Sequence, residues 1–137
     1  MRFEAIANTL PEHLGWYGGV DIALDTFPFN GATTTFQALW MGVPVVSLAG
    51  ETFISRAAES ILHQADLGDL VVDSPAAYVA CARELAGDVT RLRTLRSSLR
   101  DRIASSPMCK PAAYARSIEA AYQEMWGKWC AKSNAAP

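Results

Sequence analysis

The stretch VDIALDTFPFNGATTTFQALWMGVPVV, residues 20–46, decides the fold. Its first part, 20–26, is a near-continuous apolar run bounded by turn residues. Such a run is typical of a parallel strand that is covered on both faces, and we expect this strand to be central in its sheet. Apolar residues then recur at helical spacing over 36–43, and a Gly-Val-Pro segment ends that helix before a buried strand at 44–49. The predicted order is strand, helix, strand.

The sequence on either side of this stretch predicts further strands and helices. A short strand at 3–7 and a short helical segment at 11–19 precede it. A helix at 55–65, with Gly68 as its C-terminal cap, leads to another short strand at 70–72. From residue 75 onward the pattern is entirely helical, with helices at 75–86, 89–104 and 111–131.

Alternating strands and helices predict an α/β fold. We expect a partial Rossmann-like parallel sheet of about four strands, followed by C-terminal helices. The length of 137 residues suits one domain, since a domain takes roughly 100 to 200 residues. This domain is predicted to span residues 1–132, and the tail at 133–137 is predicted to be disordered.

The composition argues against several classes of site and partner. The 12 basic and 14 acidic residues leave a net charge of −2, which provides no general attraction to nucleic acid or to an anionic membrane. No apolar run approaches the roughly 18 residues of a membrane span. Cys81, Cys109 and Cys130 form neither a disulfide framework nor a zinc motif, and they are typical of reduced thiols in a cytoplasmic protein. With only 2 histidines in the chain, we expect no metal site.

A candidate phosphate site lies where the first strand leads into its helix. In open parallel sheets, ligands bind outside the carboxyl ends of the strands. The start of a helix presents unpaired N–H groups and partial positive charge, which favours phosphate. Gly31 and Ala32 let an anion approach the backbone, and Thr33, Thr34 and Thr35 add hydroxyl donors. The segment is neither a Walker loop nor a G-x-G-x-x-G motif.

Helix capping is a simpler explanation of the same residues. Thr34 and Gln37 fit a capping box, in which a threonine and a glutamine three residues later satisfy backbone donors reciprocally. A helix start has several unpaired donors, so capping and anion binding can coexist.

Other polar residues are predicted to be structural. Asp25 is expected to bond the turn that follows it. His63 is expected to be a solvated or packed residue in the middle of a helix. The arginines between 91 and 102 alternate with a leucine stripe, which favours a solvated helix face over a nucleic-acid site.

Residues 13–56, HLGWYGGVDIALDTFPFNGATTTFQALWMGVPVVSLAGETFISR, resemble the C-terminal catalytic lobe of the O-GlcNAc transferase family. That family includes bacterial tetratricopeptide-linked and SPINDLY-like members. The likeness continues through SSP at 105–107 and YQEMW at 122–126. The joined pattern is far more specific than any one of its pieces.

The resemblance implies a glycosyltransferase of the two-lobed GT-B architecture. In this family the C-terminal Rossmann-like lobe holds a nucleotide sugar, usually UDP-GlcNAc, at the interface between the lobes. The sugar passes to Ser or Thr of an acceptor protein with inversion and without a metal ion or other cofactor. The residues leave open whether the donor is UDP-GlcNAc or another nucleotide sugar such as GDP-fucose.

By the same resemblance, Thr33 and Thr34 meet the diphosphate and His13 contacts the nucleoside. Gln37 stands where members often carry an acid that bonds the ribose hydroxyls, and Ala32 stands where animal enzymes carry a second histidine. The nucleotide-sugar site implied as a whole comprises His13, Asn30, Gly31, Ala32, Thr33, Thr34, Thr35 and Gln37.

We expect the chain alone to be catalytically inactive. The family's N-terminal lobe, tetratricopeptide repeats and phosphate-contacting lysine have no counterpart in these 137 residues, so the catalytic residues are not identified and an acceptor protein would be recognised elsewhere. The alternative is a stand-alone nucleotide-binding or protein-interaction module without catalysis. If the final helix packs on the other lobe, as in GT-B enzymes, an exposed apolar patch is expected at Tyr114, Tyr122, Trp126 and Trp129.

Overall fold

The computed structural model describes residues 7–133. The predicted strand at 3–7 therefore lies outside the described residues except for Ala7, and so does the predicted tail at 133–137 except for Ser133, which ends the last helix. In chain order the elements are α1 (Leu10–Trp16), η1 (Tyr17–Gly19), β1 (Ala23–Leu24), α2 (Thr33–Trp40), β2 (Val45–Leu48), η2 (Ile54–Arg56), α3 (Ala57–Gln64), η3 (Gly68–Leu70), β3 (Val71–Val72), α4 (Pro75–Gly87), α5 (Val89–Ser105), η4 (Pro107–Cys109) and α6 (Pro111–Ser133), where η denotes a 3-10 helix.

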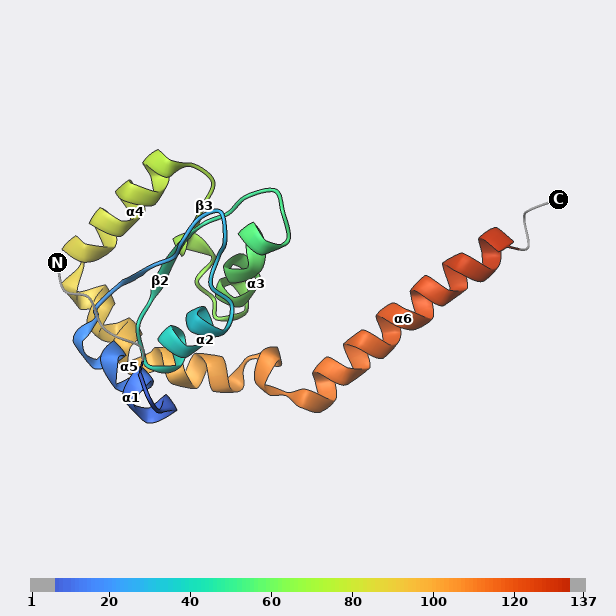
Figure 1. Cartoon of the computed structure of the whole chain (residues 1–137), viewed down its shortest axis with the longest axis horizontal. Helices are drawn as coiled ribbons and strands as arrows, with labels where there is room; N and C mark the ends of the chain where they lie inside the picture. The colour runs from blue at the N-terminus through green and yellow to red at the C-terminus, as the bar shows by residue number, and fades with distance from the viewer. Residues whose placement is uncertain (1–6, 134–137) are drawn as a thin grey trace.

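Three short parallel strands form an open sheet in the order β1-β2-β3 (Figure 1). Ala23 pairs with Val45, and Ser47 pairs with Val71. All four residues of β2 are buried, and β2 is the middle strand. The prediction that the strand within 20–26 is central is wrong for the sheet that the described residues form, where β1 lies at the edge. An apolar run reports that the faces of a strand are covered, and it carries no information about the order of strands in a sheet.

The α/β fold with a partial Rossmann-like parallel sheet and C-terminal helices is confirmed. The helix α2 ends where the sequence predicts. Gly42 has a φ of +80°, and a Cβ there would lie 2.6 Å from the carbonyl oxygen of Arg96, so glycine is required. The predicted cap at Gly68 is wrong: Asp66 is the left-handed residue after α3, with a φ of 57°, and Gly68 begins η3. An aspartate tolerates this conformation better than most residues.

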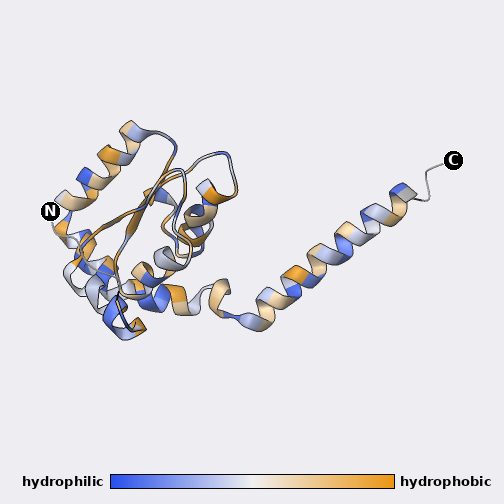
Figure 2. Ribbon diagram, viewed as in Figure 1, coloured by the Kyte–Doolittle hydropathy of each residue, from blue (hydrophilic) through white to orange (hydrophobic). Residues whose placement is uncertain are grey.

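Helices cover both faces of the sheet, with α4 on one side and α2 and α3 on the other (Figure 1). The apolar colour in Figure 2 is concentrated on the strands between them. Leu39 of α2, Leu62 of α3 and Leu99 of α5 are each 0% exposed and meet in this core. Burying one such leucine contributes about 1.5–3 kcal/mol. The core thus holds α2, whose first residues form the candidate site, firmly against the sheet.

Arg93, Arg96 and Arg100 of α5 are exposed, as predicted, whereas Arg91 and Arg102 are half-buried. Two of the exposed arginines also hold the polypeptide around the site. Arg96 donates hydrogen bonds of 3.0 Å to the carbonyl oxygens of Val20 and Tyr17. Arg100 donates to the carbonyl oxygen of Trp40 at 2.8 Å, and its guanidinium lies over the indole ring. These contacts tie α5 to the segment before β1 and to the end of α2.

The last helix, α6, extends away from the rest of the molecule (Figure 1). Tyr114, Tyr122, Trp126 and Trp129 are between 60% and 66% exposed, which confirms the predicted apolar patch. The rings of Trp126 and Trp129 stack on each other with centroids 5.2 Å apart. None of the helices within residues 7–133 combines the length and apolar character that crossing a membrane requires.

Candidate functional site

The predicted phosphate site lies at the start of α2, beside the carboxyl end of β1. Ala32 is the N-cap residue, and no side chain caps the helix. Ala32, Thr33 and Thr34 are all exposed. Because the first N–H groups of a helix have no partner within it, this start offers accessible donors and partial positive charge.

The predicted capping box of Thr34 and Gln37 does not form. The helix begins two residues earlier than a box would need, at Thr33 after Ala32, so Thr34 lies within the first turn and not at the N-cap. Gln37 instead places its Oε1 3.2 Å from Nε2 of His13 in α1. In the neutral form of the ring, a hydrogen bond to this glutamine oxygen requires the proton on Nε2, which leaves Nδ1 as an acceptor.

His13 and Gln37, both predicted to contact the nucleotide, are therefore brought together by the fold. The ring of His13 meets Trp16 edge-on at 5.4 Å and Tyr17 at 5.8 Å. The hydroxyl of Tyr17 donates to the carbonyl oxygen of Thr34 at 3.3 Å, which links α1 to the start of α2. Burial raises the pKa of Tyr17 above its ordinary value, so this hydroxyl keeps its proton at neutral pH. The sequence reasoning did not single out Tyr17, although its position one helical turn after His13 is a usable signal.

Two of the predicted residues lie inside the turn. Thr35 is 3% exposed and donates its hydroxyl to the carbonyl oxygen of Gly31 at 3.0 Å. Asn30 is 2% exposed and donates its amide to the carbonyl oxygen of Thr26 at 2.9 Å. The Oδ1 of Asn30 has no hydrogen-bond partner among the described residues. Both side chains thus support the turn from within, while the other two threonines stand at the surface.

Gly31 is required by close contacts in the same turn. A Cβ at this position would lie 2.6 Å from Oγ1 of Thr34 and 2.7 Å from Oγ1 of Thr35. Both distances are shorter than a carbon atom tolerates. The glycine therefore lets two threonine side chains converge on the backbone that precedes the helix.

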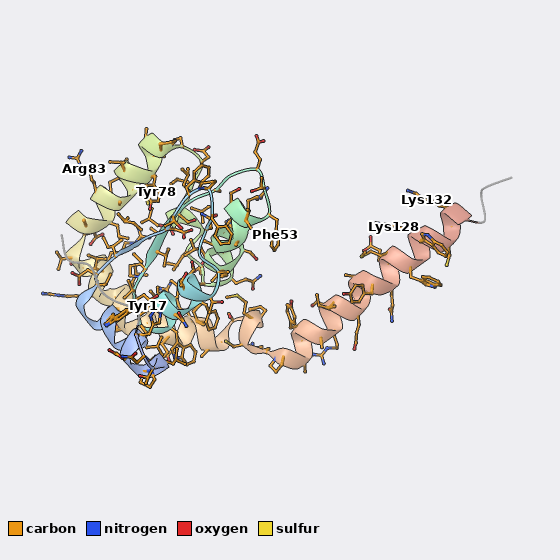
Figure 3. The ribbon with its side chains drawn as sticks, in the orientation of Figure 1. Tyr17, Phe53, Tyr78, Arg83, Lys128 and Lys132 are labelled. Atoms are coloured by element: carbon orange, nitrogen blue, oxygen red, sulfur yellow. The ribbon has the colours of Figure 1, made fainter. Side chains whose placement is uncertain are left out.

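Asp25, at the end of β1, organises this turn, as predicted. Its Oδ1 accepts hydrogen bonds from the backbone N–H of Gly31 at 2.7 Å and of Thr26 at 3.0 Å. Its Oδ2 accepts from the hydroxyl of Ser47 in β2 at 2.7 Å. The hydroxyl of Tyr78, which reaches across from α4 (Figure 3), donates to the carbonyl oxygen of Asp25 at 2.7 Å. Burial, and then the charge of Asp25, raise the pKa of Tyr78.

Ser47 and Tyr78 were not predicted to take part. Ser47 is the polar residue in an otherwise apolar strand, and a buried hydroxyl needs a partner, so the strand sequence held a signal for it. Tyr78 comes from a distant helix and carries no comparable local signal.

Two cavities adjoin the start of α2. One, of about 210 Å³, lies on the β1 side and is lined by Asp25, Gly31 and Thr34 among others. The other, of about 600 Å³, lies on the α3 side and is lined by Ala32 and Phe53 among others. A ligand held at the helix start therefore has room on both sides.

Titratable residues elsewhere form no comparable site. Among residues 7–133, no group of His, Cys, Asp and Glu side chains could hold a metal ion. His63 is exposed in α3, in agreement with its predicted structural role. Cys81, Cys109 and Cys130 are free and half-buried. Burial, and then the charge of Asp69, raise the pKa of Cys81, which lowers its reactivity at neutral pH.

The chain is similar to the probable UDP-N-acetylglucosamine--peptide N-acetylglucosaminyltransferase SPINDLY of Arabidopsis thaliana and of Oryza sativa subsp. japonica. In both cases the identity is 44% over 119 residues, which are 87% of this chain and 13% of the relative. It also resembles the solved structure of a mutant O-GlcNAc transferase from Thermobaculum terrenum, with a TM-score of 0.78 and 39% identity. That match covers 88% of this chain and 23% of the other. The chain thus spans a small part of the proteins that it matches.

The sequence profile of Glycosyl transferase family 41 matches residues 3–118. This match spans most of the chain and includes every residue of the candidate site. Together with the 44% identity to the SPINDLY proteins over 87% of its residues, it shows that the chain belongs to glycosyl transferase family 41.

Proposed function

We propose that this chain supplies the donor-binding part of a protein O-GlcNAc transferase-like glycosyltransferase. The start of α2 binds the diphosphate of a nucleotide sugar, and His13 with Gln37 binds the nucleoside. The observation that carries the proposal is a helix start that has no side-chain cap and is flanked by the exposed residues Ala32, Thr33 and Thr34. The family, and the donor and peptide acceptor in the names of the relatives, support this class of substrate.

The chemistry explains why such a helix start is useful. In inverting transfer, a hydroxyl oxygen of the acceptor attacks the anomeric carbon while the bond to the diphosphate breaks, and negative charge grows on the leaving diphosphate. A helix start carries roughly half a unit of positive charge and donors that are already oriented. The hydroxyls of Thr33 and Thr34 add two more donors. The proposal includes no metal ion or other cofactor.

The nucleoside site follows from the bond between His13 and Gln37. Since the Oε1 of Gln37 lies at Nε2 of His13, the neutral form of the histidine has Nδ1 left to accept a hydrogen bond from the nucleoside. The amide nitrogen of Gln37 is left to bond the ribose hydroxyls. A glutamine keeps much of the hydrogen-bonding capacity of an acid at this position without its charge.

The proposal also includes parts of the enzyme that lie outside this chain. We place an N-terminal lobe against the exposed apolar patch of α6, and recognition of the acceptor protein in N-terminal, tetratricopeptide-linked regions. The chain by itself transfers no sugar, because the leaving diphosphate needs more positive charge than one helix start supplies. The three free cysteines support a cytoplasmic location.

The exposed patch of α6 also favours a second candidate, a stand-alone nucleotide-binding or protein-interaction module without catalysis. The coding sequence distinguishes the two candidates. An upstream reading frame with tetratricopeptide repeats, continuous with this one, favours the enzyme, and a stop codon directly upstream favours the module.

Calorimetric titration with UDP and GDP tests the donor site on the wild type and on Thr34→Ala. A hydrogen bond to a charged group contributes about 1.5–3 kcal/mol, so removal of the hydroxyl weakens diphosphate binding about 10-fold or more. Thr94→Ala, which removes a hydroxyl from the exposed face of α5, leaves binding unchanged. If neither nucleotide binds, the proposed function is wrong. If Thr34→Ala binds as tightly as the wild type, the assignment of Thr34 to the diphosphate is wrong.

A further inference from the structure

The helix that carries His13 is not fixed by burial. None of the seven residues of α1, all within the described part of the chain, is buried. In α2, by contrast, Ala38 and Leu39 are 2% and 0% exposed and belong to the core. Because close packing fixes the positions of buried side chains, the core fixes α2, and the position of His13 relative to α2 depends on individual contacts at the surface.

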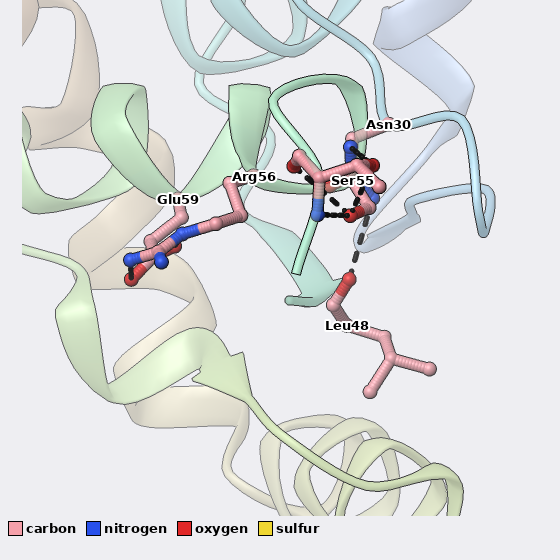
Figure 4. Close-up of polar contacts among 6 residues, drawn as sticks. Asn30, Leu48, Ser55, Arg56 and Glu59 are labelled. Carbon is pink, nitrogen blue, oxygen red and sulfur yellow. Dashed lines mark hydrogen bonds and ion pairs between the residues drawn. The ribbon is translucent and has the colours of Figure 1, made fainter. Parts of the chain in front are cut away.

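The side of the site that faces α3 is held by buried polar groups. Asn30 and Ser55 are each 2% exposed there. The Nδ2 of Asn30 donates to the carbonyl oxygen of Leu48 at 3.4 Å (Figure 4). The Oγ of Ser55 accepts from the N–H of Thr52 at 3.0 Å. These contacts fix the turn before α2 from within, so the less constrained part of the donor site is α1.

Tyr17, the first residue after α1, contacts both His13 and α2. Its ring meets the imidazole edge-on, with centroids 5.8 Å apart and planes at 89°. Its hydroxyl donates to the carbonyl oxygen of Thr34 at 3.3 Å. A phenylalanine could keep the ring contact, so the hydroxyl is the part of this side chain that joins α1 to α2.

The hydrogen bonds of His13 with Gln37 and of Tyr17 with Thr34 connect the two helices about one turn apart. His13 and Tyr17 are four residues apart, and Thr34 and Gln37 are three residues apart. Residues at these spacings lie on the same face of a helix. One bond alone would let α1 rotate about it, whereas the second bond also fixes the direction of α1 and hence the orientation of the His13 ring.

Arg96 of α5 fixes the backbone of Tyr17. Its guanidinium donates to the carbonyl oxygens of Tyr17 and Val20 at 3.0 Å and of Gly18 at 3.4 Å. A cation is favourable at these carbonyls, because the last carbonyls of a helix lack partners within it and carry partial negative charge. The helix of Arg96 is itself anchored in the core, where Leu99 is 0% exposed. Tyr17 is therefore held at its backbone by α5 and at its hydroxyl by α2.

We propose that Tyr17 is a positioning residue that holds His13 in the orientation in which Nδ1 meets the nucleoside. This inference rests on the proposed function. Tyr17 acts through His13 and not on the diphosphate, which Thr33 and Thr34 bind at the start of α2. Without the hydroxyl of Tyr17, α1 gains freedom in the nucleotide-free protein, and binding must remove that freedom again.

Calorimetric titration with UDP measures this effect. Its size is limited by the net contribution of one hydrogen bond, so Tyr17→Phe is expected to weaken UDP binding about 3- to 10-fold. Tyr122→Phe is the matched control, since it removes a hydroxyl from a residue that is 66% exposed on α6. It leaves the affinity for UDP unchanged.

A double-mutant cycle tests whether Tyr17 acts through His13. In the background of His13→Ala, Tyr17→Phe is expected to weaken UDP binding less than about twofold, because the residue that it positions is gone. In the background of Thr33→Ala, which removes a diphosphate contact, Tyr17→Phe is expected to keep its full effect. A residue that supports the fold in general would act alike in both backgrounds.

The imidazole signals in NMR spectra provide a readout without nucleotide. The chain has 2 histidines, and the variant His63→Asn assigns the signals of each. Tyr17→Phe is expected to shift the signals of His13, which its hydroxyl no longer helps to hold. The signals of His63, which lies in α3, are expected to stay unchanged.

The inference is overturned if Tyr17→Phe binds UDP as tightly as the wild type, or if its effect is the same with His13→Ala as with Thr33→Ala. It is also overturned if the His13 signals do not move in Tyr17→Phe. In each of these cases, binding of UDP by the wild type still supports the proposed function. If the wild type binds no UDP, the proposed function is wrong, and the role of Tyr17 fails with it.

Discussion

Asp25 is the residue whose loss should disturb the site most. In the wild type, the carboxylate of Asp25 accepts hydrogen bonds of 2.7 Å from the N–H of Gly31 and from the hydroxyl of Ser47. The variant Asp25→Ala leaves both donors without this acceptor. Ser47 is 0% exposed, whereas Gly31 is only half-buried and water can reach it. A buried donor without a partner costs about 1–3 kcal/mol, so the two together should lower the free energy of unfolding by about 2–4 kcal/mol.

The variant Asp25→Asn separates loss of the hydrogen bonds from loss of the charge. Its oxygen can still accept from the N–H of Gly31, and its amide can donate to Ser47 once that hydroxyl rotates. We therefore expect Asp25→Asn to cost about 1 kcal/mol, clearly less than Asp25→Ala. Asp21→Ala, at an exposed position four residues earlier, is the control and should change stability by less than about 0.5 kcal/mol.

Urea denaturation followed by circular dichroism measures these differences, provided that the slope of unfolding free energy against urea is the same in all variants. The expected order of stability is wild type, Asp25→Asn, Asp25→Ala. Our account of the turn is refuted if Asp25→Ala unfolds at the same urea concentration as Asp21→Ala. It is also refuted if the asparagine variant is as unstable as the alanine variant.

Two further predictions concern the same region. Gly31→Ala should weaken UDP binding and lower the free energy of unfolding by about 1–3 kcal/mol, because its Cβ would lie 2.6 Å from Oγ1 of Thr34. Calorimetry measures the affinity for UDP, and urea denaturation measures the free energy of unfolding. Gly15→Ala, where a Cβ meets nothing within 4 Å, should instead be neutral or stabilising, and equal effects of the two changes would contradict the packing argument. Burial and the charge of Asp25 raise the pKa of Tyr78, so its contribution to stability is fully present below about pH 10 and is lost as pH rises through its pKa in the folded protein. Tyr78→Phe should therefore flatten the fall in unfolding free energy above about pH 10, and curves that stay parallel to the wild type would disprove this.

Local sequence was sufficient to predict the turn and the helix that hold the candidate site. The glycine at 31 and the threonines after it mark a turn into a helix, and the turn and helix were found there. The pattern also suggested that Thr34 and Gln37 cap this helix, which was wrong. A capping box depends on which residue is the N-cap, and the N-cap lies at Ala32, two residues before Thr34, which removes the box.

The sequence by itself determined the order of strands and helices, because near-continuous apolar runs, helical periodicity and turn residues such as Gly42 are local properties of the chain. It also carried the motifs by which the family is identified. Only the tertiary structure decided that the side chain of Gln37 contacts that of His13, 24 positions away, and that the hydroxyl of Ser47 donates a hydrogen bond to Asp25. The position of β1 at the edge of the described sheet was likewise decided by the tertiary structure. Such contacts join segments that are distant in sequence, so they depend on how whole helices and strands pack, and no local pattern encodes them.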